Sequence, residues 1–114
     1  MRHLVGLALV LGLVAGAPAV QAQAPAPPEI ALTIEQHKFT PEEIKVKAGQ
    51  AFVLVITNKD ATPEEFESKE LRVEKVDARA TRTLKVRMGA LKPGTYKFFG
   101  EYHEATAKGR IVAE

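Results

Sequence analysis

Short stretches in which apolar and polar residues alternate follow one another from Glu29 to the end of the chain. Within residues 30–34, 44–47 and 84–88, every second residue is apolar, and the residues between them are small, polar or charged. This period of two is typical of a β-strand that buries one face, and no helical period persists beyond one or two turns. The pattern therefore predicts an all-β fold.

Residues 51–57 differ from these stretches because they are apolar on both faces and rich in β-branched side chains, as expected of a central strand. Turn-forming residues at 48–50 and 58–60 mark the ends of this strand. Further strands are expected at 71–76, 95–99 and 109–113. About seven short strands of this kind predict an antiparallel β-sandwich.

The first 22 residues have the organisation of a signal peptide. Arg2 precedes about 14 mainly apolar residues, and Val20 and Ala22 fit a cleavage site after Ala22. A membrane anchor is the alternative, but a spanning helix needs about 20 apolar residues. Residues 23–28 are rich in proline and are expected to form a flexible leader. We therefore expect an exported protein with a folded domain at 29–114 and no membrane span after cleavage.

The chain contains no cysteine, which removes a large part of metal and redox chemistry. Disulfides, thiolate zinc sites, iron–sulfur clusters and thiolate-bound blue copper are all excluded. Any metal must therefore bind through nitrogen and oxygen. The 16 basic and 14 acidic residues are scattered along the chain, without the basic run of a nucleic-acid-binding protein, so no nucleic-acid partner is expected.

Three segments carry side chains that could bind a metal. His103 lies between the last two expected strands, two residues after Glu101. Glu65 and Glu67 would share one face of an extended backbone, while the intervening Phe66 points to the other. The third segment contains His37. This histidine is a candidate ligand only if its turn lies at the same end of the fold as the other two segments. A solvent-exposed histidine and a solvated acidic loop are the simpler alternatives.

The domain resembles the cupredoxin-like proteins, and the resemblance covers residues 30–112. It is carried by short segments in a fixed order: HKFTP at 37–41, VKAG at 46–49, NKD at 58–60, LKPGTYKF at 91–98 and GRIV at 109–112. The resemblance implies a Greek-key β-sandwich.

The same resemblance shows what has been lost from a blue-copper site. Gly100 falls at the position of the family's cysteine ligand, His103 at that of the loop histidine, and either Glu64 or Glu65 at that of the upstream histidine. No methionine follows His103. A type 1 copper centre is excluded, because its colour and redox behaviour depend on a copper–thiolate bond.

Three further segments carry a narrower resemblance, namely EFES at 65–68, EK at 74–75 and FFGEYH at 98–103. They are similar to a subgroup of cupredoxin-like domains from bacterial periplasmic iron-uptake systems. This resemblance implies a periplasmic accessory protein that binds Cu(II), iron or both and assists ferrous-iron uptake or Fe(II) oxidation, with a membrane iron permease or a periplasmic iron-binding protein as its partner. Carboxylate and imidazole ligands suit these ions. The implied ligands are His103, Glu101, Glu65, Glu67 and His37, with Glu64 as the alternative to Glu65.

A different class of function remains open. A sandwich that kept the fold but lost the copper site could act as a metal-free binding module that docks on a transport partner. An independent ferroxidase would need a redox-active metal beside an open iron site, and the sequence does not show two sites.

Overall fold

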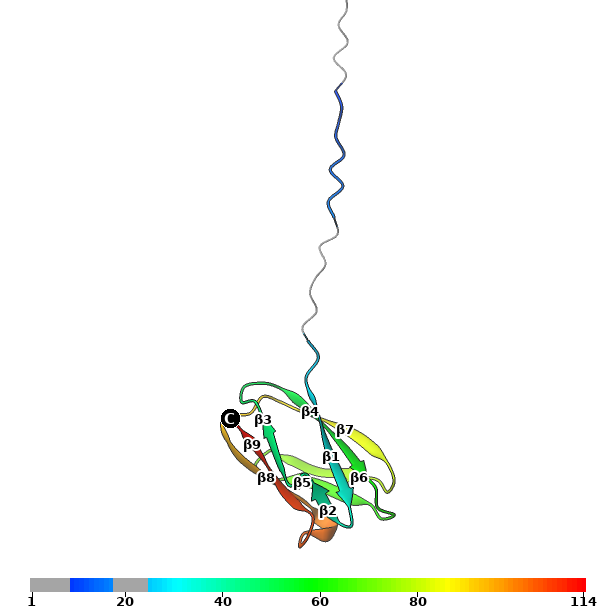
Figure 1. Ribbon diagram of the computed structural model, residues 1–114, viewed down its shortest axis with the longest axis vertical. Helices are drawn as coiled ribbons and strands as arrows, with labels where there is room; N and C mark the ends of the chain where they lie inside the picture. The colour runs from blue at the N-terminus through cyan, green and yellow to red at the C-terminus, as the bar shows by residue number, and fades with distance from the viewer. Residues whose placement is uncertain (1–8, 18–24) are drawn as a thin grey trace, which may run out of the picture.

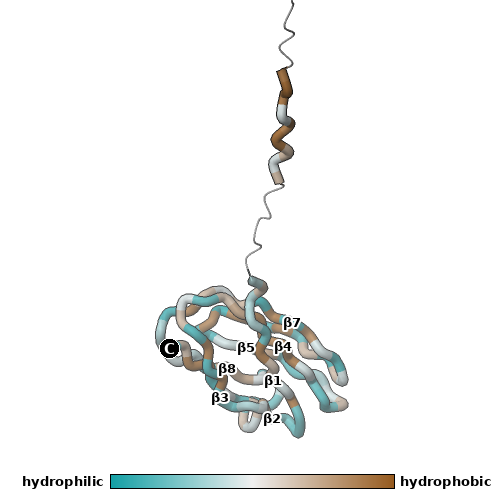
Figure 2. The backbone as a smooth tube through the Cα atoms, turned by 45° about the horizontal axis from the view of Figure 1, so that its top comes forward, coloured by the Kyte–Doolittle hydropathy of each residue, from teal (hydrophilic) through white to brown (hydrophobic). Residues whose placement is uncertain are grey.

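The computed structural model describes residues 9–17 and 25–114. The expected cleavage site at Ala22 and most of the expected signal peptide lie outside these residues. Residues 9–17 form neither helix nor strand and are strongly hydrophobic (Figure 2). Within the described part of the chain, no helix has both the length and the apolar character needed to cross a membrane.

Residues 29–113 form a two-layered β-sandwich (Figure 1). One sheet has four strands in the order β2-β1-β4-β7, and the other has five in the order β3-β9-β8-β5-β6. A single 3-10 turn, η1, joins β8 to β9. The elements are β1 (Glu29–Glu35), β2 (Lys38–Thr40), β3 (Glu43–Val46), β4 (Phe52–Asn58), β5 (Glu64–Ser68), β6 (Val73–Ala78), β7 (Thr83–Met88), β8 (Gly94–Gly100), η1 (Glu101–His103) and β9 (Lys108–Ala113).

The predicted all-β sandwich is confirmed, with nine strands where about seven were expected. Two neighbouring pairs also run parallel instead of antiparallel, namely β1 with β4 and β3 with β9. The members of each parallel pair are separated along the chain by two or more strands, at least one of which belongs to the other sheet. Because no hairpin joins them, nothing requires them to be antiparallel.

Two strands were not recognised from the sequence. β2 has only three residues, too few for a visible alternation. β5 was not among the predicted strands, since three of its five residues are glutamates, which are depleted in strands. Both strands pair at the end of the sandwich that carries the candidate site, β2 with β1 and β5 with β6 and β8.

Three phenylalanine rings fill the core beneath that end. Phe39 of β2 meets Phe66 of β5 and Phe98 of β8 edge-on, with ring centroids 6.0 and 5.1 Å apart. Phe66 and Phe98 lie 5.3 Å apart in a tilted arrangement. All three rings are at most 1% exposed, so they connect the two sheets directly below the loops.

The three segments singled out from the sequence meet above these rings. The β1–β2 turn, the start of β5 and η1 lie together at the lower end in Figure 1, opposite the end where residues 25–28 join the sandwich. Gln36 and His37 both have positive φ, of 54° and 57°, in the turn between β1 and β2. This tight turn holds His37 close to η1.

Candidate metal-binding site

The alternation of β5 divides its acidic residues between two faces. Glu64, Phe66 and Ser68 point into the sandwich and are buried, whereas Glu65 and Glu67 lie half-buried on the outer face. The expected shared face of Glu65 and Glu67 is therefore present. The two faces make two separate groups of ionisable side chains, which we call the inner pair and the outer triad.

The inner pair consists of Glu64 and His103. The carboxylate of Glu64 is 1% exposed, and its Oε2 lies 2.5 Å from Nδ1 of His103. Its Oε1 accepts hydrogen bonds from the backbone N–H groups of Tyr102 and Glu65, at 2.9 and 3.1 Å. A buried carboxylate is tolerated only when it is paired in this way. The inner pair is thus complete without any further group.

His37 and Asp60 extend the inner pair towards the first turn. The imidazoles of His37 and His103 stack with centroids 3.6 Å apart and an interplanar angle of 14°. Asp60 accepts the backbone N–H groups of Gln36 and His37 at 2.8 and 3.0 Å, so it fixes the turn that places His37. Burial raises the pKa of Asp60, but these N–H donors and the two imidazoles outweigh it and leave the pKa below its ordinary value.

Gly100 lies too close to Glu64 to carry a side chain without a shift of that carboxylate. A Cβ atom at Gly100 would lie 2.5 Å from Cδ and 2.7 Å from Oε1 of Glu64. The carboxylate of Glu64 therefore occupies the space into which a side chain at position 100 would project. The inner pair fills the place where the family resemblance puts a thiolate and its metal.

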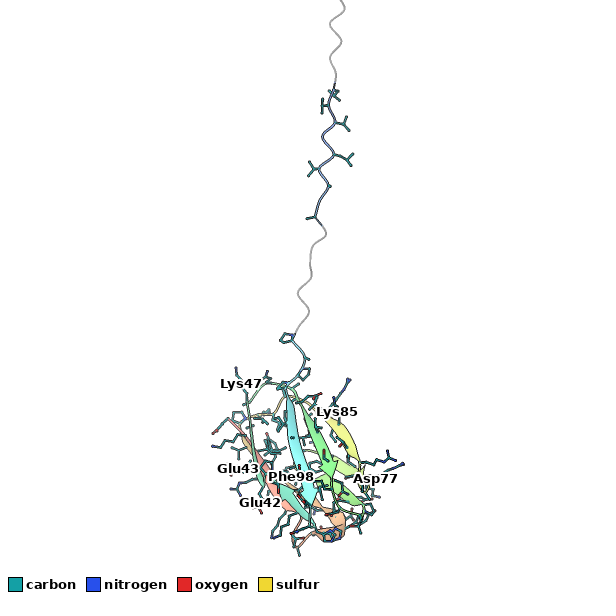
Figure 3. The ribbon with its side chains drawn as sticks, turned by 45° about the vertical axis from the view of Figure 1, so that its right-hand side comes forward. Glu42, Glu43, Lys47, Asp77, Lys85 and Phe98 are labelled. Carbon is teal, nitrogen blue, oxygen red and sulfur yellow. The ribbon has the colours of Figure 1, made fainter. Side chains whose placement is uncertain are left out.

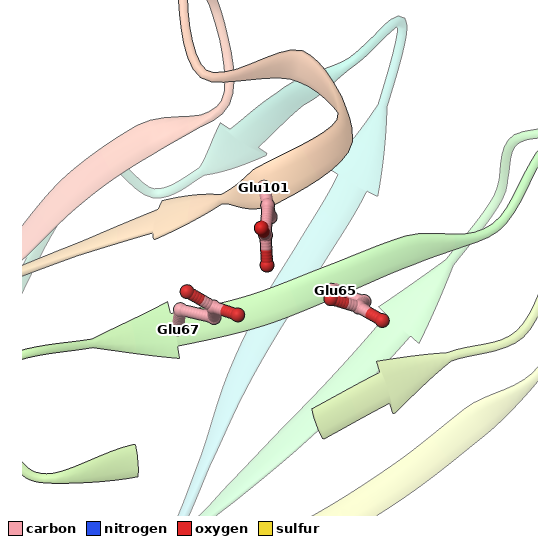
Figure 4. A group of neighbouring side chains, drawn as sticks. All are labelled: Glu65, Glu67 and Glu101. Carbon is pink, nitrogen blue, oxygen red and sulfur yellow. The ribbon is translucent and has the colours of Figure 1, made fainter. Parts of the chain in front are cut away.

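The outer triad consists of Glu65, Glu67 and Glu101, whose carboxylates converge on the outer surface (Figure 4). One oxygen from each residue lies within 4.8 Å of the others. The hydroxyl of Tyr102 donates a hydrogen bond to Oε1 of Glu65 at 2.9 Å, which raises the pKa of Tyr102. This bond also fixes one edge of the outer triad.

Crowding of three carboxylates changes the acidity of one of them. Hydrogen bonds shared first with Glu67 and then with Glu65, together with the negative charges of both, raise the pKa of Glu101 from 4.5 to about 7. Neighbouring carboxylates favour retention of a proton because that proton relieves their repulsion. A metal cation in the same position would relieve the repulsion more strongly.

We expect Glu101 of the metal-free protein to titrate close to pH 7, and Glu67→Gln to move this midpoint towards 4.5. Because the folded state holds the proton more tightly than the unfolded state, protonation adds stability fully below pH 4.5, and this contribution is lost as the pH rises through about 7. The side-chain carboxyl shift of Glu101, followed by NMR, measures the midpoint. Glu104→Gln is the control and should leave it unchanged. A midpoint near 4.5 in the unmodified protein would contradict the expectation.

The five residues expected to share one site therefore lie in two places. Glu65, Glu67 and Glu101 come together in the outer triad, whereas His103 and His37 stack on the inner side. Glu64, considered only as the alternative to Glu65, is the partner of His103.

Asp60 and Tyr102 belong to the site but were not predicted from the sequence. In the sequence, Asp60 is recognisable only as a turn residue after the central strand. Its bonds to a turn more than twenty positions away leave no local signal. Tyr102 could have been noticed as a hydroxyl between two candidate ligands.

The two groups suit metals differently. Bonds from a metal to nitrogen or oxygen are about 2.0–2.2 Å long, so two neighbouring ligands on one ion lie roughly 3 Å apart. The 2.5 Å between Glu64 and His103 is shorter, so this pair must open before both can bind one ion. The outer triad offers only carboxylate oxygens, which favour hard cations. Neither group fits a type 1 copper centre.

The strand order of this β-sandwich, with two stacked histidines and no cysteine at its loop end, defines the class of fold to which the chain belongs. The chain belongs to the cupredoxin-like domain family, whose model matches residues 6–113. The chain is 39% identical over 84 residues to the uncharacterized protein RP394 of Rickettsia prowazekii. The matched region covers 74% of this chain and 66% of RP394.

Solved structures show the same fold. Auracyanin A, a "blue" copper protein from Chloroflexus aurantiacus, superimposes with a TM-score of 0.65 at 18% identity, over 78% of this chain and all of that one. A multi-copper oxidase from Pseudomonas thermotolerans gives a TM-score of 0.63 at 11% identity, over 80% of this chain and 30% of the oxidase. The fold is thus shared with small copper proteins and with domains of multicopper oxidases.

Proposed function

We propose that this protein is an exported metal-binding accessory protein of ferrous-iron uptake, and that the outer triad holds its metal ion. The observation that carries the proposal is the convergence of three carboxylate oxygens within 4.8 Å of one another. This crowding raises the pKa of Glu101 to about 7, so that Glu101 retains a proton near neutral pH. Cation binding would displace that proton and neutralise the repulsion among Glu65, Glu67 and Glu101.

The ligand chemistry favours iron over copper at the outer triad. Carboxylate oxygens are hard ligands, and they suit Fe(II) and Fe(III) better than Cu(I). Cu(II) accepts imidazole readily, and it would bind instead at His103 with Glu64 or His37 once the inner pair opens. The two metals are therefore expected to use different residues of the same end of the fold.

The accessory role in iron uptake is supported by the organisation of the chain and by its resemblance to iron-uptake domains. The apolar N-terminal segment favours export to the periplasm, where a permease or an iron-binding protein would receive the ion. Turnover as an independent oxidase is not part of the proposal, because Fe(II) oxidation needs an electron acceptor beside the iron.

Metal titration of the purified protein tests the proposed site. We expect one Fe(II) to bind under anaerobic conditions at neutral pH, and Glu101→Gln to weaken its affinity about tenfold or more. Glu104→Gln is the matched control, because Glu104 is an exposed glutamate of the same loop that lies outside the triad. Isothermal titration calorimetry gives the affinity and the number of protons released.

Equal affinity of both variants would exclude the outer triad as the iron site. The metal content of protein isolated from its own periplasm identifies the native ion, because loading with excess metal in vitro would favour Cu(II) whatever the function.

A metal-free binding module is the second candidate function, and the inner pair favours it. The carboxylate of Glu64 makes three hydrogen bonds within the protein, and it occupies the position at which the resemblance would place a metal. Absence of both Fe(II) and Cu(II) binding at neutral pH would leave this function in place of the first.

A further inference from the structure

We propose that β7 is a docking edge for an extended segment of a partner protein in which acidic and aliphatic residues alternate. β7 is the last strand of the four-stranded sheet and pairs only with β4 among the described strands. In an antiparallel pair, alternate residues direct their backbone N–H and C=O groups away from the neighbour. The outer edge of β7 therefore offers a row of hydrogen-bonding groups to an added strand.

Of the four edge strands, β2, β3, β6 and β7, β7 is the one best suited to pair with an added strand. β2 and β3 have three and four residues, whereas β7 has six in unbroken register with β4 from Thr83 to Met88. β6 has six residues as well, but Lys75 within it has a positive φ of 51° and its pairing with β5 is irregular. A regular edge of this length matches an ordinary strand.

The inward-facing side chains near this edge are apolar and incompletely covered. Leu84 and Val86 of β7 pack against the core but remain half-buried, as do Val73 and Val76 of β6. Central positions such as Leu54 are fully buried. Figure 1 shows β6 and β7 on the same side of the sandwich, and a hollow of about 450 Å³ there is lined by Asp77, Arg79, Arg82, Thr83 and Leu84. Aliphatic side chains of an added strand could bury the exposed parts of these apolar side chains.

The charged side chains on and just before β7 are positive, which favours a negatively charged partner. No acidic residue occurs between Ala78 and Gly100, whereas Arg79, Arg82, Lys85 and Arg87 all lie on or just before β7. Arg79 pairs with Asp77 and Lys85 with Glu29. Arg82 and Arg87 make no salt bridge to any described residue, and both are exposed. Figure 3 shows Lys85 and Asp77 on the side of the sandwich where β6 and β7 lie.

The same charges argue against a second copy as the occupant. Pairing of β7 with β7 of another molecule would bring Lys85 and Arg87 close to like charges, which is unfavourable. Charges on an edge strand commonly serve only to prevent such pairing. That role accounts for Lys85 and Arg87, but not for Arg79 and Arg82 in the preceding turn or for the half-covered apolar row. An acidic and aliphatic strand satisfies both features.

The experiment uses a synthetic peptide of about ten residues in which glutamate and valine alternate, with a lysine–valine peptide of the same length as the control. We expect the glutamate peptide to shift the NMR amide signals of β7 and to slow their hydrogen exchange, in a salt-sensitive manner. In the Arg82→Glu and Arg87→Glu double variant, the affinity should fall at least tenfold. The Lys97→Glu and Lys108→Glu double variant, with the same charge change on exposed residues of β8 and β9, should bind like the unmodified protein.

Several results would overturn the proposal. These are the absence of peptide binding, shifts confined to strands other than β7, equal binding of the lysine peptide, or equal loss in both double variants. Binding to vesicles of phosphatidylglycerol that depends on Arg82 and Arg87, without any peptide binding, would assign this edge to a membrane surface instead. If the arginine variant failed to fold, the comparison of the two peptides on the unmodified protein would still decide the question.

Discussion

Replacing Glu64 with histidine and Gly100 with cysteine together is expected to give an intensely coloured copper protein. A side chain at position 100 would point at the present carboxylate of Glu64, and His103 already lies 2.5 Å from that carboxylate. The double replacement therefore directs two imidazoles and one thiolate to one point. This is the trigonal ligand set of blue-copper sites, in which a copper–thiolate transition produces the strong colour.

Addition of Cu(II) to the anaerobic double variant, followed by visible absorption and electron paramagnetic resonance, measures this outcome. Glu65→His with Gly100→Cys is the matched control. It adds the same two side chains, but places the histidine on the outer face of β5, so it should lack the full ligand set. Gly100→Cys alone should fold less stably, because the new atoms collide with a carboxylate held by three hydrogen bonds. A folded, copper-binding double variant without the band would show that position 100 does not face the metal.

Glu64→Ala is expected to destabilise the protein by about 3 kcal/mol. The substitution removes a buried charged partner from His103 and leaves the backbone N–H groups of Tyr102 and Glu65 without their acceptor. For a domain of this size, such a loss lowers the melting temperature by about 10 °C or more. Chemical denaturation gives the free energy of unfolding directly.

Glu65→Ala provides the control on the opposite face of the same strand. Glu65 is only half-buried and accepts one hydrogen bond from the exposed hydroxyl of Tyr102, so its removal should cost less than about 1 kcal/mol. Glu64→Gln should fall between the two, because it keeps the volume but loses the charge. Equal effects of Glu64→Ala and Glu65→Ala would mean that the inner pair contributes little to folding.

The strands whose buried face is marked by alternation were predictable from the sequence, and so was the orientation of β5 around Phe66. That orientation also requires Glu64 to point inward, since it lies two residues before Phe66. A buried carboxylate is nevertheless unfavourable until its partner is known, and His103 lies 39 positions further along the chain. The sequence therefore left open which of Glu64 and Glu65 faces His103, and the fold shows that it is Glu64.

The separation of the two ionisable groups was not predictable for a related reason. Glu101 and His103 are two residues apart, which in an extended strand would place them on one face. They lie instead in the 3-10 turn η1, which sends Glu101 to the outer surface and His103 to the inner pair. The parallel pairing of β1 with β4 also depends on the path of the whole chain, and alternation within single strands carries no information about it.

The three phenylalanine rings beneath the loops have a consequence for how an ion could be delivered. Phe39 follows His37 by two residues, Phe66 lies between Glu65 and Glu67, and Phe98 precedes Gly100 by two. The surrounding backbone is therefore anchored by hydrophobic packing and would keep its shape with or without an ion. Small metal domains that fold only around their metal cannot release it without unfolding. Under the proposed function, this aromatic base would let the protein release its ion to a partner without unfolding and bind another ion in the same conformation.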